Sequence, residues 1–159
     1  MVTTDESAIR QELRSLAEQY ARGVDRRDDV DGFVGLFHPD AVITIHDPSE
    51  TSEPREIRGV ERLARIPEVI TRYPKTFHML GQSTYVIGDG EATGEVYCIA
   101  HHLTPGEQHA APEEGGTDHV MFIRYEDTYR PNDEGAWKFA HRRLRVDWTE
   151  TRAVNPPSA

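Results

Sequence analysis

The segment Tyr20-Ala-Arg-Gly-Val-Asp25-Arg-Arg-Asp28 closes the first predicted helix and carries Asp25, the residue on which most of the functional prediction depends. Thr3 and Glu6 form a capping box that predicts where this helix begins. Asp25 is unexpected in the last turn, because cations are favoured at the negative end of the helix dipole. Apolar residues recur at helical spacing through about residue 27, at Ile9, Leu13, Leu16, Ala17, Tyr20, Ala21 and Val24.

The segment between residues 30 and 73 predicts two more helices and a strand. A short helix presents Val30, Phe33, Val34 and Phe37 on one face, and His38-Pro39-Asp40 ends it. Residues 41–46 form a β-rich run, and residues 48–54 have the composition of a loop. A third helix is expected from Ile57-Arg58-Gly59 to about Tyr73, with a kink or restart at Pro67.

After residue 75 the pattern predicts four strands, near residues 78–86, 92–103, 118–130 and 137–148. Gly88-Asp-Gly90 predicts a tight hairpin turn, and residues 104–117 predict a mobile loop. Helices followed by an antiparallel meander indicate an α+β fold. We expect one domain over residues 1–148 and a tail over 149–159. In that domain, three N-terminal helices pack on a strongly curved, mostly antiparallel sheet that encloses a cavity.

Composition excludes several classes of function. A net charge of −10 argues against binding to nucleic acid or to an anionic membrane surface. No run approaches the roughly 20 apolar residues that span a bilayer, and the N-terminus lacks a secretory signal pattern. The one cysteine, Cys98, suits a reducing compartment, so a cytoplasmic location is expected. The expected partner is a neutral or apolar small molecule.

Asp25 and His78 are the candidate catalytic pair. His78 lies near the start of a predicted strand, in Lys75-Thr-Phe-His78-Met. If the fold brings the two together, the aspartate orients the imidazole, which acts as a general base near neutral pH. On periodicity alone, Asp25 lies on the flank of the apolar stripe and is also compatible with a solvated acid. His78 alone is equally compatible with a structural histidine.

Three further residues are candidates for substrate contact. Arg142 is either a cavity cation or a surface arginine, and strand alternation lets only one of Arg142 and Arg143 point inward. His102 and His101 must likewise face opposite sides. Tyr20 lies on the apolar stripe, where it either packs in the core or offers its hydroxyl to the cavity.

No cofactor or metal site is predicted. The histidines show no ligand spacing, and no glycine-rich phosphate loop or dinucleotide fingerprint is present. Cys98 has no activating motif and is interpreted as a buried small hydrophobe.

Taken in order, several fragments resemble the SnoaL-like group of the nuclear transport factor 2-like (cystatin-like α+β) superfamily. The resemblance covers roughly residues 5 to 148 and is strongest near scytalone dehydratase and lindane dehydrochlorinase. The fragments are Tyr20-Ala-x-x-x-Asp25-x-x-Asp28, Leu36-Phe37-His-Pro-Asp40-Ala-Val, Arg58-Gly59-Val-Glu61, Thr76-x-His78-Met, Gly88-Asp-Gly-Glu-Ala92, Tyr125-Glu-Asp127-Thr-Tyr129 and Trp137-Lys-Phe-Ala-His-Arg142.

The resemblance implies roles for the candidate residues. Asp25 and His78 match the aspartate–histidine dyad of those enzymes, Arg142 resembles a cavity arginine and His102 a second cavity histidine. The chain differs from scytalone dehydratase at Val24, where that enzyme has a tyrosine. It differs from the dehydrochlorinase at Tyr20, where that enzyme has a lysine.

The leading hypothesis is a cofactor-independent lyase, similar to a dehydratase, that acts on a hydrophobic or polycyclic small molecule by His–Asp general base catalysis. An isomerase or a polyketide-type cyclase with the same base is the alternative among enzymes. A non-catalytic binding or assembly module, like the small subunit of a ring-hydroxylating dioxygenase, is the alternative outside them. A homodimer or homotrimer is expected, because the back of the sheet is usually a subunit interface in this superfamily.

Overall fold

The computed structural model describes residues 4–47, 53–105 and 115–154, and the first helix predicted from the sequence is present as α1 (Thr4–Arg26). Its apolar stripe is buried, with Leu13, Ala17 and Val24 at most 2% exposed. The predicted cap residue Thr3 lies outside the described residues. The helix ends where Arg27 adopts a φ of 58°, the left-handed conformation common just after a helix.

The next segment differs from the prediction at its boundaries. A short helix, α2 (Val30–Val34), is capped by Asp29, whose side chain accepts a hydrogen bond from the Gly32 backbone N–H at 2.8 Å. Strand β1 (Phe37–His46) then starts at Phe37, so His38-Pro39-Asp40 begins a strand and does not end a helix. The pairing of β1 with β6 is irregular between Phe37 and Val42, and such a position tolerates a proline that cannot donate a backbone hydrogen bond.

The expected third helix is replaced by a strand and three short helical turns. Strand β2 (Arg55–Arg58) pairs antiparallel with β1 at the edge of the sheet. After Gly59 follow α3 (Val60–Leu63), α4 (Ile66–Val69) and the 3₁₀ turn η1 (Ile70–Arg72). Pro67 lies in the first turn of α4, where its missing N–H costs nothing, so the predicted interruption is a restart. Of the predicted loop at 48–54, residues 48–52 lie outside the described residues.

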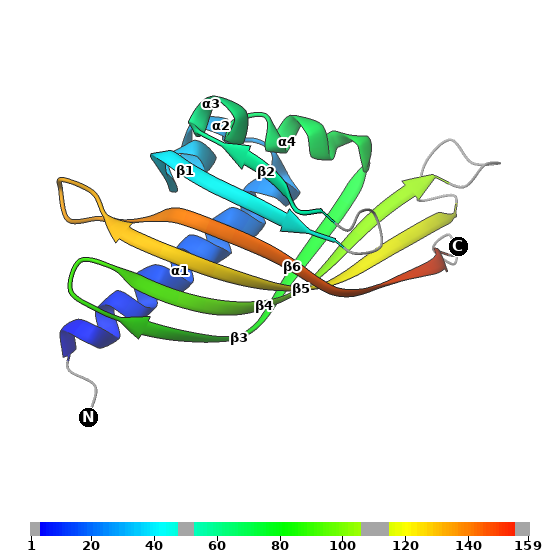
Figure 1. Cartoon of the computed structure of the whole chain (residues 1–159). Coiled ribbons are helices and arrows are strands. Elements are labelled where there is room, and N and C mark those ends of the chain that lie inside the picture. Colours follow the sequence, from blue (N-terminus) through cyan, green and yellow to red (C-terminus); the bar gives the residue numbers. More distant parts are fainter. Residues whose placement is uncertain (1–3, 48–52, 106–114, 155–159) are drawn as a thin grey trace.

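The remaining strands are longer than predicted: β3 (Lys75–Ile87), β4 (Ala92–Pro105), β5 (Gly116–Pro131) and β6 (Trp137–Val154). They complete a six-stranded sheet in the order β2-β1-β6-β5-β4-β3 (Figure 1). Only the β1–β6 pair is parallel in the described sheet. The α+β prediction is confirmed. Part of the expected tail, through Val154, is strand, and most of the predicted 104–117 loop, residues 106–114, lies outside the described residues.

Bulges interrupt the alternation of the long strands and bend the sheet. The β5–β6 register shifts between Phe122 and Ile123, because Ile123 pairs with Val146 whereas Phe122 pairs with Trp148. Asp147 is therefore an extra residue on β6, and a bulge of this kind increases bend and twist. The β5–β6 register shifts again between Thr128 and Tyr129, and the pairing of β3 with β4 shifts between Leu80 and Ser83.

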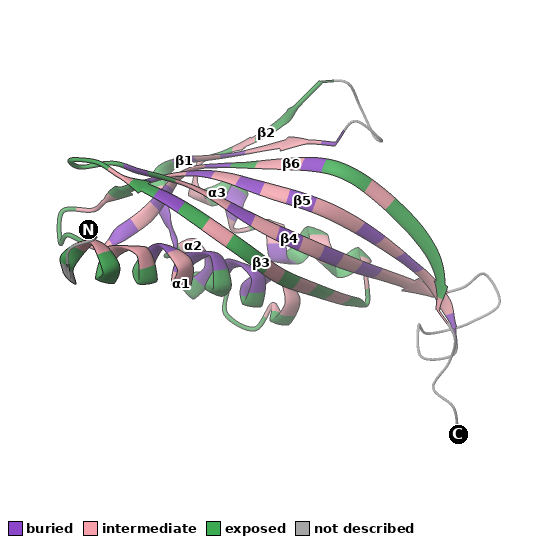
Figure 2. Cartoon of the chain, turned by 90° about the horizontal axis from the view of Figure 1, so that it is seen from below, coloured by how far each residue is buried: buried purple, intermediate pink, exposed green. Residues whose placement is uncertain are grey.

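Helix α1 lies across the concave face of the curved sheet, and along most of β4 and β5 buried residues alternate with residues of intermediate exposure (Figure 2). The helix packs mainly against β3. Within the described residues, none of the helices combines the length and the apolar character needed to cross a membrane.

Candidate active site

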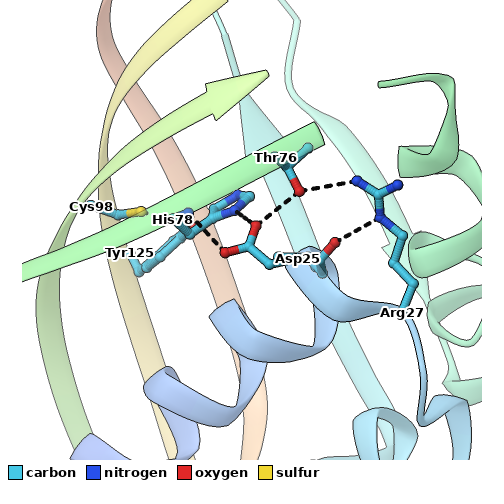
Figure 3. Close-up of polar contacts among 7 residues, drawn as sticks. Asp25, Arg27, Thr76, His78, Cys98 and Tyr125 are labelled. Carbon is cyan, nitrogen blue, oxygen red and sulfur yellow. Dashed lines mark hydrogen bonds and ion pairs between the residues drawn. The ribbon is translucent and has the colours of Figure 1, made fainter. Parts of the chain in front are cut away.

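Asp25 in the last turn of α1 and His78 near the start of β3 point toward each other (Figure 3). His78 Nδ1 lies 2.7 Å from Asp25 Oδ1. The His78 backbone N–H donates to Asp25 Oδ2 at 2.9 Å. Because main chain and ring of the same residue both contact the carboxylate, the position and the orientation of the imidazole are fixed together.

Thr76 and Arg27 hold the carboxylate from the other side (Figure 3). The Thr76 hydroxyl donates to Asp25 Oδ1 at 2.9 Å and accepts from Arg27 Nη2 at 3.0 Å. Arg27 Nε donates to the Val24 carbonyl at 3.1 Å, which satisfies one free carbonyl of the helix end. A cation at this helix terminus offsets the unfavourable position of Asp25 on the dipole.

The hydrogen bonds around Asp25 determine the protonation of the pair. Burial alone would raise the pKa of Asp25, but the hydrogen bonds from the His78 ring, the His78 backbone and Thr76 hold that pKa below its ordinary value. The carboxylate is therefore ionised at neutral pH and only accepts hydrogen bonds. His78 Nδ1 must carry the proton, which leaves Nε2 of the neutral ring as the nitrogen that can accept one.

His78 faces a cavity of about 370 Å³ between the sheet and the segment from β2 to η1. Its side chain is only 6% exposed, so the imidazole ring is largely shielded from bulk water. The volume falls in the range of small-molecule sites. Ten of the 21 lining residues are aliphatic or methionine: Val24, Ile43, Ile45, Ile57, Ile66, Val69, Ile70, Met121, Ile123 and Leu144.

His102 lines the same cavity on the neighbouring strand. Its ring centroid lies 5.5 Å from that of His78 and 4.8 Å from that of Tyr73. Burial, together with the nearby His78, lowers the pKa of His102 to about 4, so the ring is neutral at physiological pH. Its Nδ1 is buried and has no hydrogen-bond partner among the described residues. A neutral, unsatisfied imidazole at this position is available to a polar group of a bound molecule.

Arg142 lies in the core and is not among the residues that line the cavity. It is fully buried and forms two hydrogen bonds with Asp127, from Nε at 2.9 Å and from Nη2 at 2.7 Å. Burial alone would lower the pKa of Arg142, but the Asp127 carboxylate raises it, so the pair stays ionised. The guanidinium also packs on the rings of Tyr20, Tyr125 and Phe139, at 4.2 to 4.3 Å from their centroids.

Tyr20 contacts both the cavity and the buried side chain of Arg142. It lines the cavity, and its ring packs 5.4 Å from Phe33 and lies against the Arg142 guanidinium. Burial raises the pKa of Tyr20 to about 12, so its phenol stays protonated. Burial likewise raises the pKa of Cys98 to about 11, and the Tyr125 hydroxyl donates to its Sγ at 3.5 Å.

The alternatives left open by strand alternation are settled by the register. His102 faces the cavity, whereas His101 points to the other face, where its Nδ1 lies 2.7 Å from Asp118 Oδ2. Arg142 points inward, whereas the Arg143 side chain is 47% exposed and pairs with Glu126.

Several residues of the site were not predicted from the sequence. Thr76 lies two residues before His78, and the two-residue period of a strand would have placed both on one face. His119 lines the cavity opposite His102, with ring centroids 6.5 Å apart, and only the β4–β5 register brings them together. In the described part of the chain, no three histidine, cysteine, aspartate or glutamate side chains gather closely enough to hold a metal ion.

Comparison with known proteins places the chain in a family. The sequence profile of the SnoaL-like domain family matches residues 5–143. The chain belongs to the SnoaL-like domain family. The resemblance inferred from the ordered sequence fragments is thereby confirmed. No curated protein sequence matches this SnoaL-like protein significantly.

Solved structures share the fold of the SnoaL-like protein at low sequence identity. A protein of unknown function from Mycobacterium tuberculosis has a TM-score of 0.70 and 23% identity over 90% of this chain and 75% of that chain. A protein named as a scytalone dehydratase from Novosphingobium aromaticivorans has a TM-score of 0.70 and 21% identity over 99% of both chains. A hexachlorocyclohexane dehydrochlorinase from Novosphingobium barchaimii has a TM-score of 0.75 and 17% identity over 98% of this chain and 97% of that chain. At these identities the likeness is one of fold.

Proposed function

We propose that this SnoaL-like protein is a cofactor-independent lyase of the dehydratase type, with His78 as general base. The observation that carries the proposal is the 2.7 Å contact between His78 Nδ1 and Asp25 Oδ1 beside an apolar cavity of about 370 Å³. The names of two proteins with the same fold, a scytalone dehydratase and a hexachlorocyclohexane dehydrochlorinase, support an elimination reaction.

In the proposed step, His78 Nε2 takes a proton from a carbon of the substrate. The electron pair of the broken C–H bond forms a C=C bond as the leaving hydroxide or halide departs. For a hydroxide, the proton held by His78 is returned to it, so the product is water and the imidazole is regenerated. For a halide, the anion leaves and His78 releases its proton to solvent, so the net loss is HX. Asp25 stabilises the transient imidazolium, and a base of this kind contributes about 10²–10⁴-fold to the rate.

His102 and Tyr20 are proposed to contact the polar end of the substrate. Nδ1 of the neutral His102 ring has no hydrogen-bond partner among the described residues, so it is the ring nitrogen available to a polar group of the substrate. Arg142 is proposed to act indirectly, through the residues that line the cavity, because its charge is already paired with Asp127. It holds the Tyr20 and Tyr125 rings in place and does not bind substrate itself.

The test measures proton abstraction from carbon separately from loss of the leaving group. Apolar β-hydroxy ketones and β-halo ketones are incubated with the protein in D₂O, and deuterium uptake and elimination are followed by NMR. Wild type is expected to show both, and His78→Gln neither. His101→Gln is the matched control, because His101 also contacts an aspartate but faces the opposite side of the sheet.

Each outcome assigns the protein to one class. Deuterium uptake without elimination favours the isomerase or cyclase alternative with the same base. No His78-dependent exchange with any compound favours a non-catalytic binding module. Turnover that is unchanged in His78→Gln refutes the mechanism.

A further inference from the structure

We infer that the substrate of this cavity carries an oxyanionic group on an apolar skeleton, and that arginines of the segment from β2 to η1 bind that group. The inference rests on the proposed function, because it names the substrate class of the same site. It replaces the neutral ligand expected from composition with an organic acid, in which a carboxylate, sulfate or phosphate supplies the charge.

The cavity lining is rich in positive charge, whereas the chain as a whole is negatively charged. Four arginines line it, Arg55, Arg62, Arg65 and Arg72, and Asp47 is the one carboxylate that lines it among the described residues. The chain as a whole carries a net charge of −10. A cleft with apolar walls and cations on one side focuses the field and attracts anions.

Three of these arginines have guanidinium groups that are free to bind an anion. The Arg62 side chain forms no hydrogen bond or ion pair with any described residue. Arg65 reaches Glu68 only at 4.0 Å, and both of those side chains are about three-quarters exposed. The Arg72 guanidinium lies over the Tyr73 ring, 4.9 Å from its centroid. That same ring packs on His102, so Arg72 lies at the histidine end of the cavity.

Arginines elsewhere in the protein are mostly paired with carboxylates at shorter distances. Arg145 lies 2.6 Å from Glu126, Arg124 lies 2.7 Å from Asp147 and Arg10 lies 2.8 Å from Glu6. The simplest alternative is that the cavity arginines are ordinary surface charges. That alternative does not explain why, in a chain with 28 acidic residues, Arg62, Arg65 and Arg72 have no carboxylate within 3.5 Å among the described residues.

The two kinds of polar group in the cavity lining come from different parts of the fold. The arginines come from a continuous stretch, residues 55–72, whereas His78, His102 and His119 come from strands β3, β4 and β5. Figure 1 shows α3 and α4 lying beside β2, the edge strand of the sheet. A bound acid would place its oxyanion on the arginines and its apolar skeleton against the aliphatic walls, with a carbon near His78. Guanidinium groups suit this role because their fork of donors matches the oxygens of a carboxylate, sulfate or phosphate.

Isothermal titration calorimetry tests the inference with matched probes. Naphthylacetic acid is compared with its methyl ester, and naphthyl phosphate and naphthyl sulfate are compared with naphthol. Wild type is expected to bind each anion about tenfold or more tightly than its neutral partner, the order expected for one charge-assisted pair. The relative affinities of the three anions identify which oxyanion is preferred.

The variants locate the site. The double variant Arg62→Gln/Arg72→Gln is expected to bind the anion and its neutral partner equally. The double variant Arg22→Gln/Arg58→Gln removes the same charge at exposed positions outside the cavity, where the arginines pair with Asp28 and Glu56, and is expected to keep the preference. Melting temperatures establish that both variants are folded.

The inference is overturned if wild type binds no anion more tightly than its neutral partner, or if the preference survives in Arg62→Gln/Arg72→Gln. Its failure can be told from that of the proposed function. His78→Gln should keep the preference for anions while losing deuterium exchange. If wild type exchanges deuterium into neutral ketones but shows no preference for anions, only the inference is refuted. If it prefers anions but shows no His78-dependent deuterium exchange, only the proposed function is refuted.

Discussion

At the scale of single residues, Asp25 receives three hydrogen bonds, and each contributes differently to the proposed base. Asp25→Asn keeps the shape of the side chain but removes the charge that stabilises the imidazolium, so the rate of deuterium exchange should fall by about 10²-fold or more. Thr76→Val removes one supporting hydrogen bond, worth about 0.5–1.5 kcal/mol, and should slow exchange by less than about tenfold. The measurement is the NMR exchange rate of one ketone at fixed pH. Equal rates in wild type and Asp25→Asn would contradict the assigned role.

His102 makes stability depend on pH. The unfolded chain protonates this imidazole near pH 6.5 and the folded chain near pH 4, so the unfolded state binds more protons between those values. Stability is therefore fully present above about pH 6.5 and is lost as pH falls. Between pH 7 and pH 5 the free energy of unfolding should drop by about 2 kcal/mol from this residue.

Urea unfolding at the two pH values checks this expectation. His102→Gln should lose that part of the pH dependence, while His101→Gln on the opposite face should keep it. If wild type and His102→Gln show the same dependence, the imidazole is not held neutral by burial.

The residue-scale prediction from sequence succeeded only partly, and for physical reasons. Asp25 and His78 were paired through the resemblance, since helical periodicity alone left the aspartate on a flank. The partner of Arg142, Asp127, was missed because the two meet through a cross-strand register that no local pattern encodes. The catalytic role of the pair stays a prediction, and for Arg142 the proposed role is now support of the Tyr20 and Tyr125 rings in place of direct substrate contact.

At the scale of elements, the contact between α1 and α2 sets the position of the helix end that carries Asp25. A Cβ added at Gly23 would lie 2.6 Å from Phe33 Cδ2, and the Phe33 ring is packed against Tyr20 and Phe37. Gly23→Ala should therefore destabilise the protein by about 1–3 kcal/mol, although alanine favours a helix by about 1 kcal/mol. Chemical denaturation measures it, and Arg22→Ala, next to it on the exposed side, should change stability by less than about 0.5 kcal/mol. A stabilised Gly23→Ala would mean that the two helices separate easily.

The elements missed by the sequence are those in which tertiary pairing overrides local pattern. Strand β2 consists of Arg55, Glu56, Ile57 and Arg58, and a short charged strand at an edge shows no apolar alternation. The start of β1 was missed because Pro39 resembles a helix terminator, yet an irregular pairing accommodates it. The four long strands were found, because alternation over many residues is a strong signal.

At the scale of the whole molecule, the outer face of the sheet presents large apolar side chains. Phe77, Met79 and Trp148 are 50 to 58% exposed, and Trp148 stacks on Phe122 at 4.2 Å. A contiguous apolar patch on a soluble protein commonly marks an association surface. The homodimer or homotrimer expected from the sequence stays a prediction, and this face is where we expect the subunits to meet.

Light scattering coupled to size-exclusion chromatography tests that expectation. Wild type should elute as a dimer or trimer, and Trp148→Lys should elute as a monomer because a charge cannot be buried in the contact without a partner. Gln11→Lys, on the exposed side of α1, adds the same charge elsewhere and should leave the mass unchanged. A monomeric wild type would contradict the prediction.

The extra residue at Asp147 has a consequence for changes in chain length. Because Asp147 and Trp148 both point to the outer face, the alternation of β6 is reversed from this point to its end. Deleting one residue here would restore strict alternation and turn the indole of Trp148 toward the concave side, away from Phe122. A single deletion could thus exchange the two faces of the last part of the strand, which no substitution can do.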